Sequence, residues 1–150
     1  MTISSTGRVL GVDVGTVRIG LALSDLERIV ATPFQTVQAR DQQAAIEEIS
    51  ALAAAHQVQA LVIGLPLDLD GTEGRAAKRT RRFVERLEAR LALPVHWLDE
   101  RLTSQQATRA LLEADMGRAQ RKKVIDQVAA ALILQSWLDA QRAAPPYGAR

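Results

Sequence analysis

Cysteine is absent from this chain of 150 residues, which excludes disulfide bonds, thiolate metal sites and a cysteine nucleophile. Histidine is nearly absent too. The sequence places His56 at the end of a predicted helix and His96 inside a predicted strand, so we expect neither a histidine metal site nor a Ser-His-Asp triad. A chain without cysteine fits a reducing compartment, and we expect the protein to be cytoplasmic.

Long apolar runs and the common nucleotide-binding loops are missing as well. No run approaches the roughly 18 apolar residues that cross a membrane, and the opening residues MTISSTGR lack the apolar core of a secretory signal. Neither GxxxxGK[ST] nor GxGxxG occurs. Hydrophobic residues make up 47% and charged residues 24%, which is the balance of an ordinary globular domain. We therefore expect no membrane association.

Apolar periodicity predicts strands in the first forty residues and alternating strands and helices after them. The expected elements are strands at 8–14, 18–25 and 31–38, a helix capped by Asp41, a strand at 61–64, a helix after the 64–74 loop, a strand at 95–98, and helices at 104–114 and about 123–141. This order predicts an α/β fold with a mixed five-stranded sheet, three antiparallel strands followed by two parallel ones, flanked by helices. We expect one domain over residues 1–141 and a flexible tail over 142–150, which contains two prolines.

The 64–74 segment, GLPLDLDGTEG, is a turn-rich loop with a strong turn signal at Asp70–Gly71. Asp70 with Glu73, or Thr72 alone, is expected to cap the helix that follows. That helix is amphipathic, because its apolar residues recur on one side and its arginines on the other.

Three acidic residues occupy positions where a carboxylate is normally unfavourable: Asp13, Glu100 and Asp126. Asp13 interrupts an apolar strand, Glu100 directly follows a strand, and Asp126 lies on the apolar face of a strongly hydrophobic helix. Burying a lone ionised carboxylate costs several kcal/mol or more, so such groups are paired, neutralised or bound to a metal. Three of them from distant parts of the chain predict a site for hard divalent cations.

Each of these acids also has a purely structural interpretation. Asp13 suits the end of a strand, where it would accept hydrogen bonds from turn amides near Gly15. Glu100 is explained equally by an exposed loop with local ion pairs, in which Asp99 competes with it as a ligand. Asp126 is explained by the helix dipole if it lies in the first turn. Its place on the apolar face nevertheless favours a functional role.

Basic residues cluster in two segments, although the formal net charge is only +2. Residues 75–90 contain seven Lys/Arg against two Glu, and residues 118–123 contain four bases and no acid. Solvated helix ends explain either cluster alone, but a nuclease needs basic groups for the phosphate backbone beside its carboxylates. The candidates for nucleic-acid contact are Arg18, Arg75, Arg79, Arg82, Arg101, Arg121 and Lys122.

The ligand types define the expected chemistry. Carboxylates without thiolate or imidazole ligands favour Mg²⁺ or Mn²⁺. Two such ions, roughly 3.5–4 Å apart, activate a water on one side of a phosphate and stabilise the leaving oxygen on the other. We therefore expect a hydrolase of phosphodiester bonds, with Asp13, Glu100 and Asp126 as its catalytic metal ligands and a nucleic acid as its substrate.

Four motifs, in their order and spacing, resemble those of the YqgF/RuvX family: GVDVGTVRIGLALSD, GLPLDLDGTEG, DERLTSQQA and KKVIDQVAAALILQSWL. The resemblance extends from about Arg8 to Leu138. It implies a ribonuclease H-like fold related to the Holliday junction resolvase RuvC. It also implies that Asp13, Glu100 and Asp126 are the metal-binding catalytic acids, the same three residues that the physical argument selects.

The resemblance further implies a substrate. The family is described as maturing the 5′ end of the small-subunit ribosomal RNA precursor, and resolution of Holliday junctions has also been proposed for it. We therefore expect an endonuclease acting on pre-16S rRNA, with a resolvase in DNA recombination and repair as the alternative. One departure is visible: family members often carry Lys where this chain has Val17, whereas Arg18 is retained. A resolvase would need a two-fold dimer and an RNA-processing enzyme would not, so monomer and homodimer both stay open.

Two other function classes fit parts of the sequence. A D-x-G-T motif, here Asp13 to Thr16, also opens the phosphate-binding hairpin of actin-like sugar kinases. A kinase of that type is not expected, because 150 residues leave no room for its second half and its adenosine-binding segment. A non-catalytic nucleic-acid-binding module would be expected to have lost one of the three acids, and none is lost.

Overall fold

The described part of the chain forms strands and helices in the predicted order. The computed structural model describes residues 6–103 and 118–143, except for the side chains of residues 118–123. Its elements are strands β1 (Arg8–Val14), β2 (Arg18–Ser24) and β3 (Ala31–Gln38), helix α1 (Gln42–Ala55), strand β4 (Val58–Leu65), helix α2 (Arg75–Leu91), strand β5 (Val95–Asp99), the short 3-10 helix η1 (Glu100–Leu102) and helix α4 (Arg118–Ala143).

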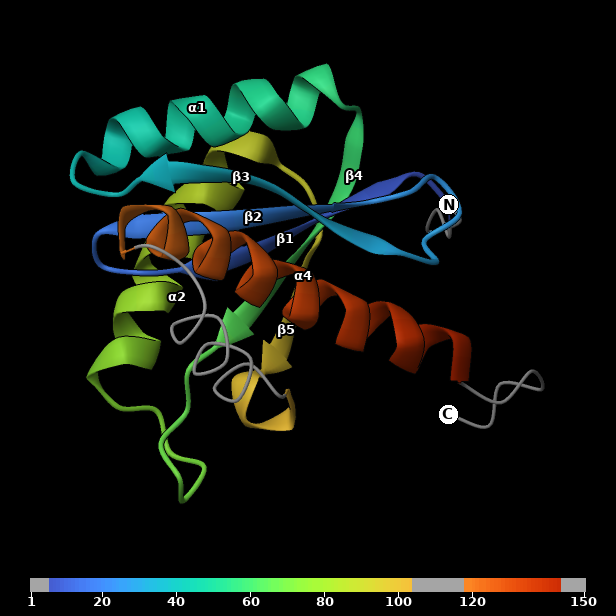
Figure 1. The fold of residues 1–150 in the computed structure, drawn as a ribbon. Helices are drawn as coiled ribbons and strands as arrows, with labels where there is room; N and C mark the ends of the chain where they lie inside the picture. The colour runs from blue at the N-terminus through green and yellow to red at the C-terminus, as the bar shows by residue number, and fades with distance from the viewer. Residues whose placement is uncertain (1–5, 104–117, 144–150) are drawn as a thin grey trace.

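One five-stranded sheet connects these elements, with the strand order β3-β2-β1-β4-β5 (Figure 1). Strands β1, β2 and β3 are antiparallel neighbours, whereas β4 lies parallel to β1 and β5 parallel to β4. The β1–β2 hairpin closes at Gly15, whose amide donates to the carbonyl of Arg18 at 3.0 Å. The predicted mixed sheet is therefore confirmed, and Pro33 lies in the edge strand β3, where its missing N–H is tolerated.

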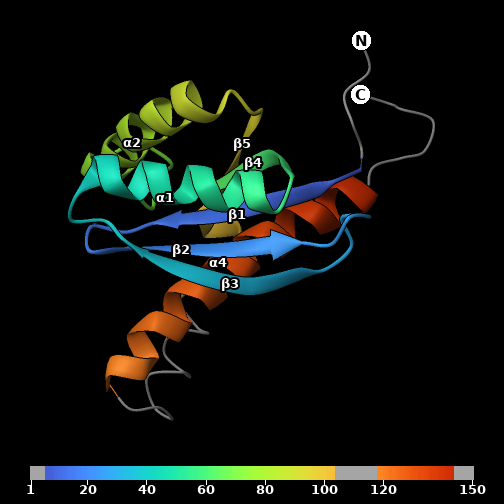
Figure 2. The same ribbon diagram turned by 90° about the horizontal axis from the view of Figure 1, so that it is seen from above.

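Helices α1 and α2 cover one face of the sheet, and α4 covers the other (Figure 2). Alternate residues of β1 point to opposite faces. Leu10 and Val12 pack into the core beneath α1 and α2, whereas Val9 packs against α4. By the same alternation Asp13 faces α4, so its carboxylate lies on the side of the sheet that carries Asp126.

Helix α4 lies unusually close to the sheet because glycines line its path. A Cβ atom added at Gly20 of β2 would collide with the backbone carbonyl oxygen of Asp126. A Cβ atom at Gly11 of β1 would come within 2.7 Å of the Cβ of Leu134 and 2.9 Å of the carbonyl oxygen of Ala130. Any larger residue would force the helix outward, so these glycines set the height of Asp126 above β2.

The two helices on the other face begin differently. Helix α1 follows Asp41 as predicted, since the Asp41 side chain accepts a hydrogen bond from the amide of Ala44 at 3.1 Å. The predicted cap of α2 is wrong. The N-cap residue is Gly74, which has no side chain to accept a hydrogen bond from the amides of the first turn. The carboxylate of Asp70 instead accepts from the amide and the hydroxyl of Thr72, at 3.0 and 2.7 Å. The Asp70 carboxylate is therefore hydrogen-bonded within the loop and does not cap the helix.

Helix α4 extends from Arg118 to Ala143, further at both ends than the predicted 123–141. The predicted start followed the apolar periodicity, which begins only after the polar residues 118–123. Arginine, alanine, glutamine and lysine are nevertheless good helix formers, so the helix continues through them. The helix predicted at 104–114 and the tail from residue 144 onward lie outside the described residues. Within the described residues, no helix is long and apolar enough to cross a membrane.

Candidate active site

A pocket of about 320 Å³ lies where the β1–β2 hairpin, the end of β4, η1 and α4 meet. Its lining consists of residues 13–18 of the hairpin, Pro66 after β4, Ala76 and Arg79 of α2, Glu100 of η1 and Asp126 of α4. The pocket is at the carboxyl ends of the parallel strands, which is the usual ligand side of an open α/β sheet. All three acids selected from the sequence therefore border one pocket.

Asp13 is buried near the end of β1 and is only 8% exposed. In the sheet it pairs with Gly20, the glycine above which the backbone of Asp126 lies. Asp13 and Asp126 therefore come from adjoining places on the same face of the sheet. The amide of Gly15 donates to the carbonyl of Arg18 and closes the hairpin directly after Asp13.

Asp126 is equally buried, with 8% of its surface exposed. It lies eight residues after Arg118, the first residue of α4, so it is well beyond the first turn. The helix-dipole interpretation of this acid is therefore wrong, because that interaction decays within one turn. The Nε of Arg18 instead donates to Asp126 Oδ2 at 2.6 Å, in an ion pair whose side chains are 24% and 11% exposed.

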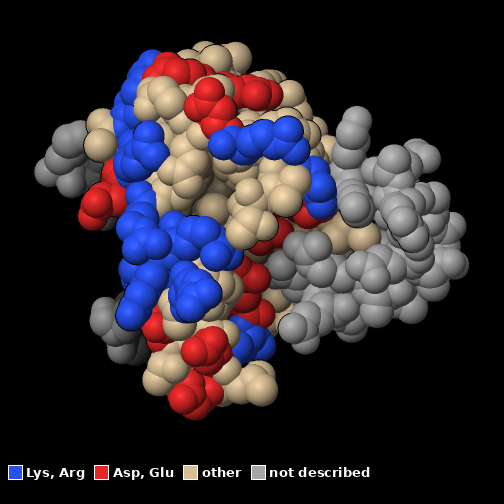
Figure 3. All heavy atoms as spheres, turned by 90° about the vertical axis from the view of Figure 1, so that its left-hand side faces the viewer, with Lys and Arg blue, Asp and Glu red and all other residues tan. Residues whose placement is uncertain are grey.

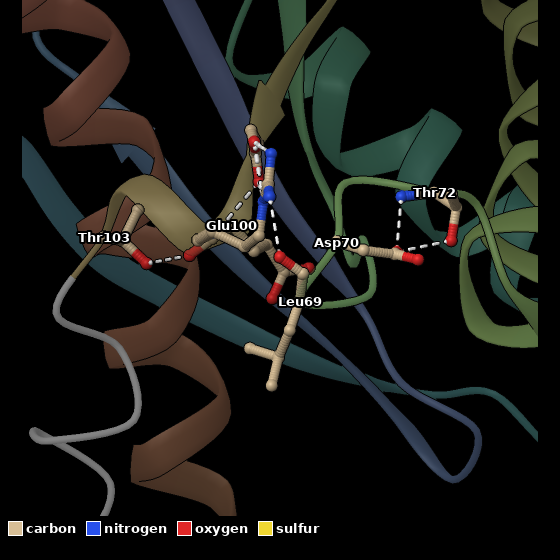
Figure 4. Close-up of polar contacts among 7 residues, drawn as sticks. Leu69, Asp70, Thr72, Glu100 and Thr103 are labelled. Atoms are coloured by element: carbon tan, nitrogen blue, oxygen red, sulfur yellow. Dashed lines mark hydrogen bonds and ion pairs between the residues drawn. The ribbon is translucent and has the colours of Figure 1, made fainter.

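Glu100 opens the turn after β5, and its side chain extends over the end of β4. A Cβ atom added at Gly64 of β4 would lie 3.0 Å from Glu100 Oε2. The amide and the hydroxyl of Thr103 both donate to the Glu100 carbonyl, at 3.2 and 3.0 Å, and hold the backbone of this turn (Figure 4). Its competitor Asp99 is not among the described residues that line the pocket. Hydrogen bonds from the Arg101 guanidinium hold Asp99 and lower the pKa of its carboxyl group.

The loop between β4 and α2 is attached to the Glu100 turn through Arg101. The Arg101 Nη1 donates to the Leu69 carbonyl at 3.2 Å, while its other nitrogens bind Asp99. Figure 4 shows the dashed contact that reaches the Leu69 carbonyl, with Asp70 and Thr72 bonded to each other further along the loop. Arg101 was predicted to contact nucleic acid, but its guanidinium is already occupied by protein groups.

The donor set suits a hard divalent cation, but the carboxylates are not gathered around one point. Among residues 6–103 and 118–143, no three acidic or histidine side chains lie close enough to hold an ion together. One oxygen of Asp126 is bound to Arg18 instead. The three acids therefore share one pocket, and within the described residues they do not form a preformed metal cluster. Carboxylate oxygens from three separate elements still match Mg²⁺ or Mn²⁺ in kind.

Helix α2 places a basic face at the rim of the pocket. Arg79 lines the pocket itself, and Arg75 and Arg82 lie one turn away from it on either side of the same helix face. Within the described residues these three arginines have no ion-pair partner. Figure 3 shows Lys and Arg side chains gathered in a band on this side of the molecule, beside Asp and Glu side chains. Two other arginines of α2 are already paired, Arg81 with Glu73 and Arg90 with Glu47.

The remaining basic candidates fall into two groups. Arg18 lines the pocket but is paired with Asp126. Arg121 and Lys122 belong to α4, yet their side chains lie outside the described part of the structure. Of the seven predicted nucleic-acid contacts, Arg75, Arg79 and Arg82 are therefore the ones that the described structure leaves available for phosphate.

A family model named RuvX, with the description "Holliday junction resolvase", matches residues 7–140. The chain belongs to the RuvX family. A relative from Myxococcus xanthus, named "Putative pre-16S rRNA nuclease", is 46% identical over 139 residues, which cover 93% of this chain and 91% of the relative. One from Moorella thermoacetica with the same name is 46% identical over 132 residues, covering 88% of this chain and 94% of the relative.

Solved structures confirm the ribonuclease H-like fold of this RuvX protein. Thermus thermophilus RuvC, in complex with a Holliday junction substrate, superposes with a TM-score of 0.55 at 13% identity, covering 91% of this chain and 96% of that one. The fowlpox virus Holliday junction resolvase gives a TM-score of 0.54 at 11% identity, covering 89% and 99%. At such low identity the likeness concerns the fold alone.

Sequence reasoning on this RuvX chain missed two features of the site. The ion pair between Arg18 and Asp126 joins residues more than a hundred positions apart, and no local pattern signals it. The role of Gly20 was missed as well, although a glycine inside an apolar strand is itself a signal that another backbone approaches closely.

Proposed function

We propose that this chain is a metal-dependent endonuclease that hydrolyses phosphodiester bonds in the cytoplasm, and that its substrate is the 5′ region of the pre-16S rRNA. Nuclease activity is supported by membership of the RuvX family and by the names of its relatives. The observation that carries the proposal is the placement of three acids, from β1, η1 and α4, around one pocket with the basic face of α2 at its rim. Carboxylates for metal ions and guanidinium groups for phosphate are the two requirements of this chemistry.

The roles of the residues follow from their places. Asp13, Glu100 and Asp126 would hold Mg²⁺ or Mn²⁺, which when bound would activate water and stabilise the leaving oxygen. Arg79 in the pocket would bind the phosphate next to the scissile bond, since a guanidinium group matches two phosphate oxygens at once. Arg75 and Arg82 would hold neighbouring phosphates of the same strand and fix its direction across the pocket.

A second candidate is a resolvase of branched DNA. It is favoured by the description of the family model and by the superposition on RuvC, which in that structure is bound to a Holliday junction. Such an enzyme would act as a homodimer with two pockets, whereas the RNA-processing role is satisfied by a monomer. A non-catalytic nucleic-acid-binding module would bind either substrate without cutting it.

Cleavage of two substrates distinguishes these functions. Purified protein is incubated with a labelled pre-16S rRNA fragment and with a labelled four-way DNA junction, each in Mg²⁺, Mn²⁺ or EDTA. We expect metal-dependent cleavage of the RNA, reduced by about 100-fold or more in Asp13→Asn and Asp126→Asn variants, the scale of losing one group that stabilises transition-state charge. Cutting of the junction alone would support the resolvase. Tight binding without cutting in any metal would refute an enzymatic role.

A further inference from the structure

The ion pair between Arg18 and Asp126 joins two residues that both line the pocket. The distance from Arg18 Nε to Asp126 Oδ2 is 2.6 Å, which is the length of a strong charge-assisted hydrogen bond. Both side chains are largely shielded from water, at 24% and 11% exposure, so the interaction is stronger than that of an exposed pair. The carboxylate that the proposed function assigns to a metal ion is therefore already bound to a cation of the protein itself.

Electrostatics explains why a cation is needed at this position. Asp13 and Asp126 are both buried, and Asp13 pairs in the sheet with Gly20, directly beneath the backbone of Asp126. Two buried carboxylates on the same face raise each other's energy unless a positive charge lies nearby. Arg18 is two residues before Gly20 on β2, next to the hairpin turn, and from there its side chain supplies that charge.

We propose that Arg18 is a positioning residue that competes with a divalent cation for Asp126 and exchanges this carboxylate for a substrate phosphate. This inference rests on the proposed function. With a divalent cation held by the acids of the pocket, Asp126 would no longer need the charge of Arg18, and the guanidinium group would move away from the added positive charge. Because β2 anchors Arg18 at the edge of the same pocket, the released guanidinium stays within it and meets the phosphate there. Metal binding and substrate binding are thereby coupled through one side chain.

A purely structural role makes a different prediction. If the pair only ties α4 to β2, its removal would lower stability and leave Asp126 misplaced, so that metal affinity would fall or stay unchanged. Competition predicts the opposite sign, because the substitution removes one cation that competes with the metal ion for the Asp126 carboxylate. The direction of the change in metal affinity therefore separates the two roles.

Calorimetric titration with Mn²⁺ tests the competition in wild type, Arg18→Gln and Arg18→Lys. We expect Arg18→Gln to bind Mn²⁺ on the order of tenfold more tightly, the scale on which groups next to metal ligands alter affinity. Arg18→Lys keeps the charge but loses the planar fork, and is expected to bind slightly more tightly than wild type. Arg79→Gln is the matched control, since it removes one pocket charge without an ion pair, and its effect on Mn²⁺ affinity should be clearly smaller.

Thermal unfolding provides a readout that is independent of activity. In EDTA, Arg18→Gln should unfold at a lower temperature than wild type, because the buried Asp126 loses the charge of Arg18. Mn²⁺ should raise the Tm of the variant by more than it raises that of wild type. Binding of the variant to a fluorescein-labelled RNA hairpin in Ca²⁺ should weaken.

Two results would overturn the inference, and they differ in what they refute. Unchanged or weaker Mn²⁺ binding by Arg18→Gln, with wild type binding normally, would show that Arg18 is only a structural tie. If Arg18→Gln fails to fold, Arg18→Lys carries the test, and Mn²⁺ binding no tighter than that of wild type would likewise show a structural tie. Absence of Mn²⁺ binding by wild type itself would refute the metal-dependent function on which the inference rests.

Discussion

Glu100 and Asp99 are adjacent carboxylates with different surroundings, and this difference defines the site at the scale of single residues. Glu100 borders the pocket, whereas Asp99 is held by Arg101 in a local ion pair. The sequence offers both residues as metal ligands, because it does not show which of two adjacent acids points toward the site. Only the direction of each side chain, set by the turn after β5, separates them.

Substitution of each acid by its amide tests this assignment. Glu100→Gln should reduce metal-dependent cleavage by about 100-fold or more, since it removes a charge that faces the pocket. Asp99→Asn should keep most of the activity, because within the described residues the Asp99 carboxylate binds Arg101 and, through it, supports the Leu69 loop. Initial cleavage rates of the labelled RNA measure both. A larger loss in Asp99→Asn would mean that Asp99 is the ligand.

His96 gives the fold a dependence on pH. It lies in β5 against the ring of Trp137, and burial, together with the charge of Arg28, lowers its pKa in the folded protein below the usual 6.5. Well above pH 6.5 His96 is neutral in both states and has no effect. As the pH falls below that value, the unfolded chain takes up a proton that the folded chain does not, so stability decreases.

Urea unfolding between pH 7.5 and about 5 measures this effect. The free energy of unfolding should fall with pH in wild type and fall less in His96→Phe, which fills the same place beside Trp137 without a titrating group. His56→Gln removes the other histidine and should retain the wild-type slope, because His96 is unchanged. Identical slopes in wild type and His96→Phe would show that other groups cause the dependence.

At the scale of elements, helix α2 combines a core face with a basic face. Thr80, Phe83 and Leu87 are buried against the sheet, as the periodicity predicts. The opposite side carries arginines, but the structure divides them into paired and unpaired ones. The sequence pattern predicts which side of the helix is basic. Whether each arginine can bind phosphate depends on the acidic side chains that other parts of the fold place beside it.

The arginines of α2 that have no ion-pair partner in the described part of the chain should dominate nucleic-acid binding. We expect the combined change of Arg75, Arg79 and Arg82 to Gln to weaken RNA binding, and to make the slope of log K against log salt shallower by roughly one for each lost phosphate contact. Fluorescence anisotropy at several salt concentrations measures both quantities. The matched control changes Arg81 and Arg90 to Gln on the same helix, and should alter the slope much less because their charges are used within the protein. Equal effects would refute the division into paired and unpaired arginines.

At the scale of the whole molecule, the distance between α4 and the sheet decides whether the acids can act together. Asp13 is fixed by β1, and Glu100 by the turn after β5, but Asp126 belongs to a helix that packs across the strands. Gly20 and Gly11 let that helix approach the backbone of the sheet. The site therefore depends on packing at residues that carry no functional group.

A methyl group at Gly20 should disturb this packing. Gly20→Ala places a Cβ against the carbonyl of Asp126, so we expect a loss of about 1–3 kcal/mol in the free energy of unfolding and a clear loss of metal-dependent cleavage. Chemical denaturation and the cleavage assay measure the two effects. Val17→Ala, in the exposed part of the neighbouring hairpin turn, is the control and should leave stability nearly unchanged. A Gly20→Ala protein with wild-type stability and activity would contradict the close approach.

The sequence by itself determined the order of the described strands and helices, the mixed sheet, the family and the choice of three acids as candidates, because periodicity, motifs and unfavourably placed charges can be read along a chain. It did not determine the start of α4, the cap of α2 or the partner of Asp126. The three-dimensional structure decided those. Asp70 accepts hydrogen bonds from Thr72 within its own loop and does not cap α2, and Arg18 of β2 binds Asp126 of α4. A sequence pattern shows that a buried charge needs a partner, and only the packing of the folded chain selects which one.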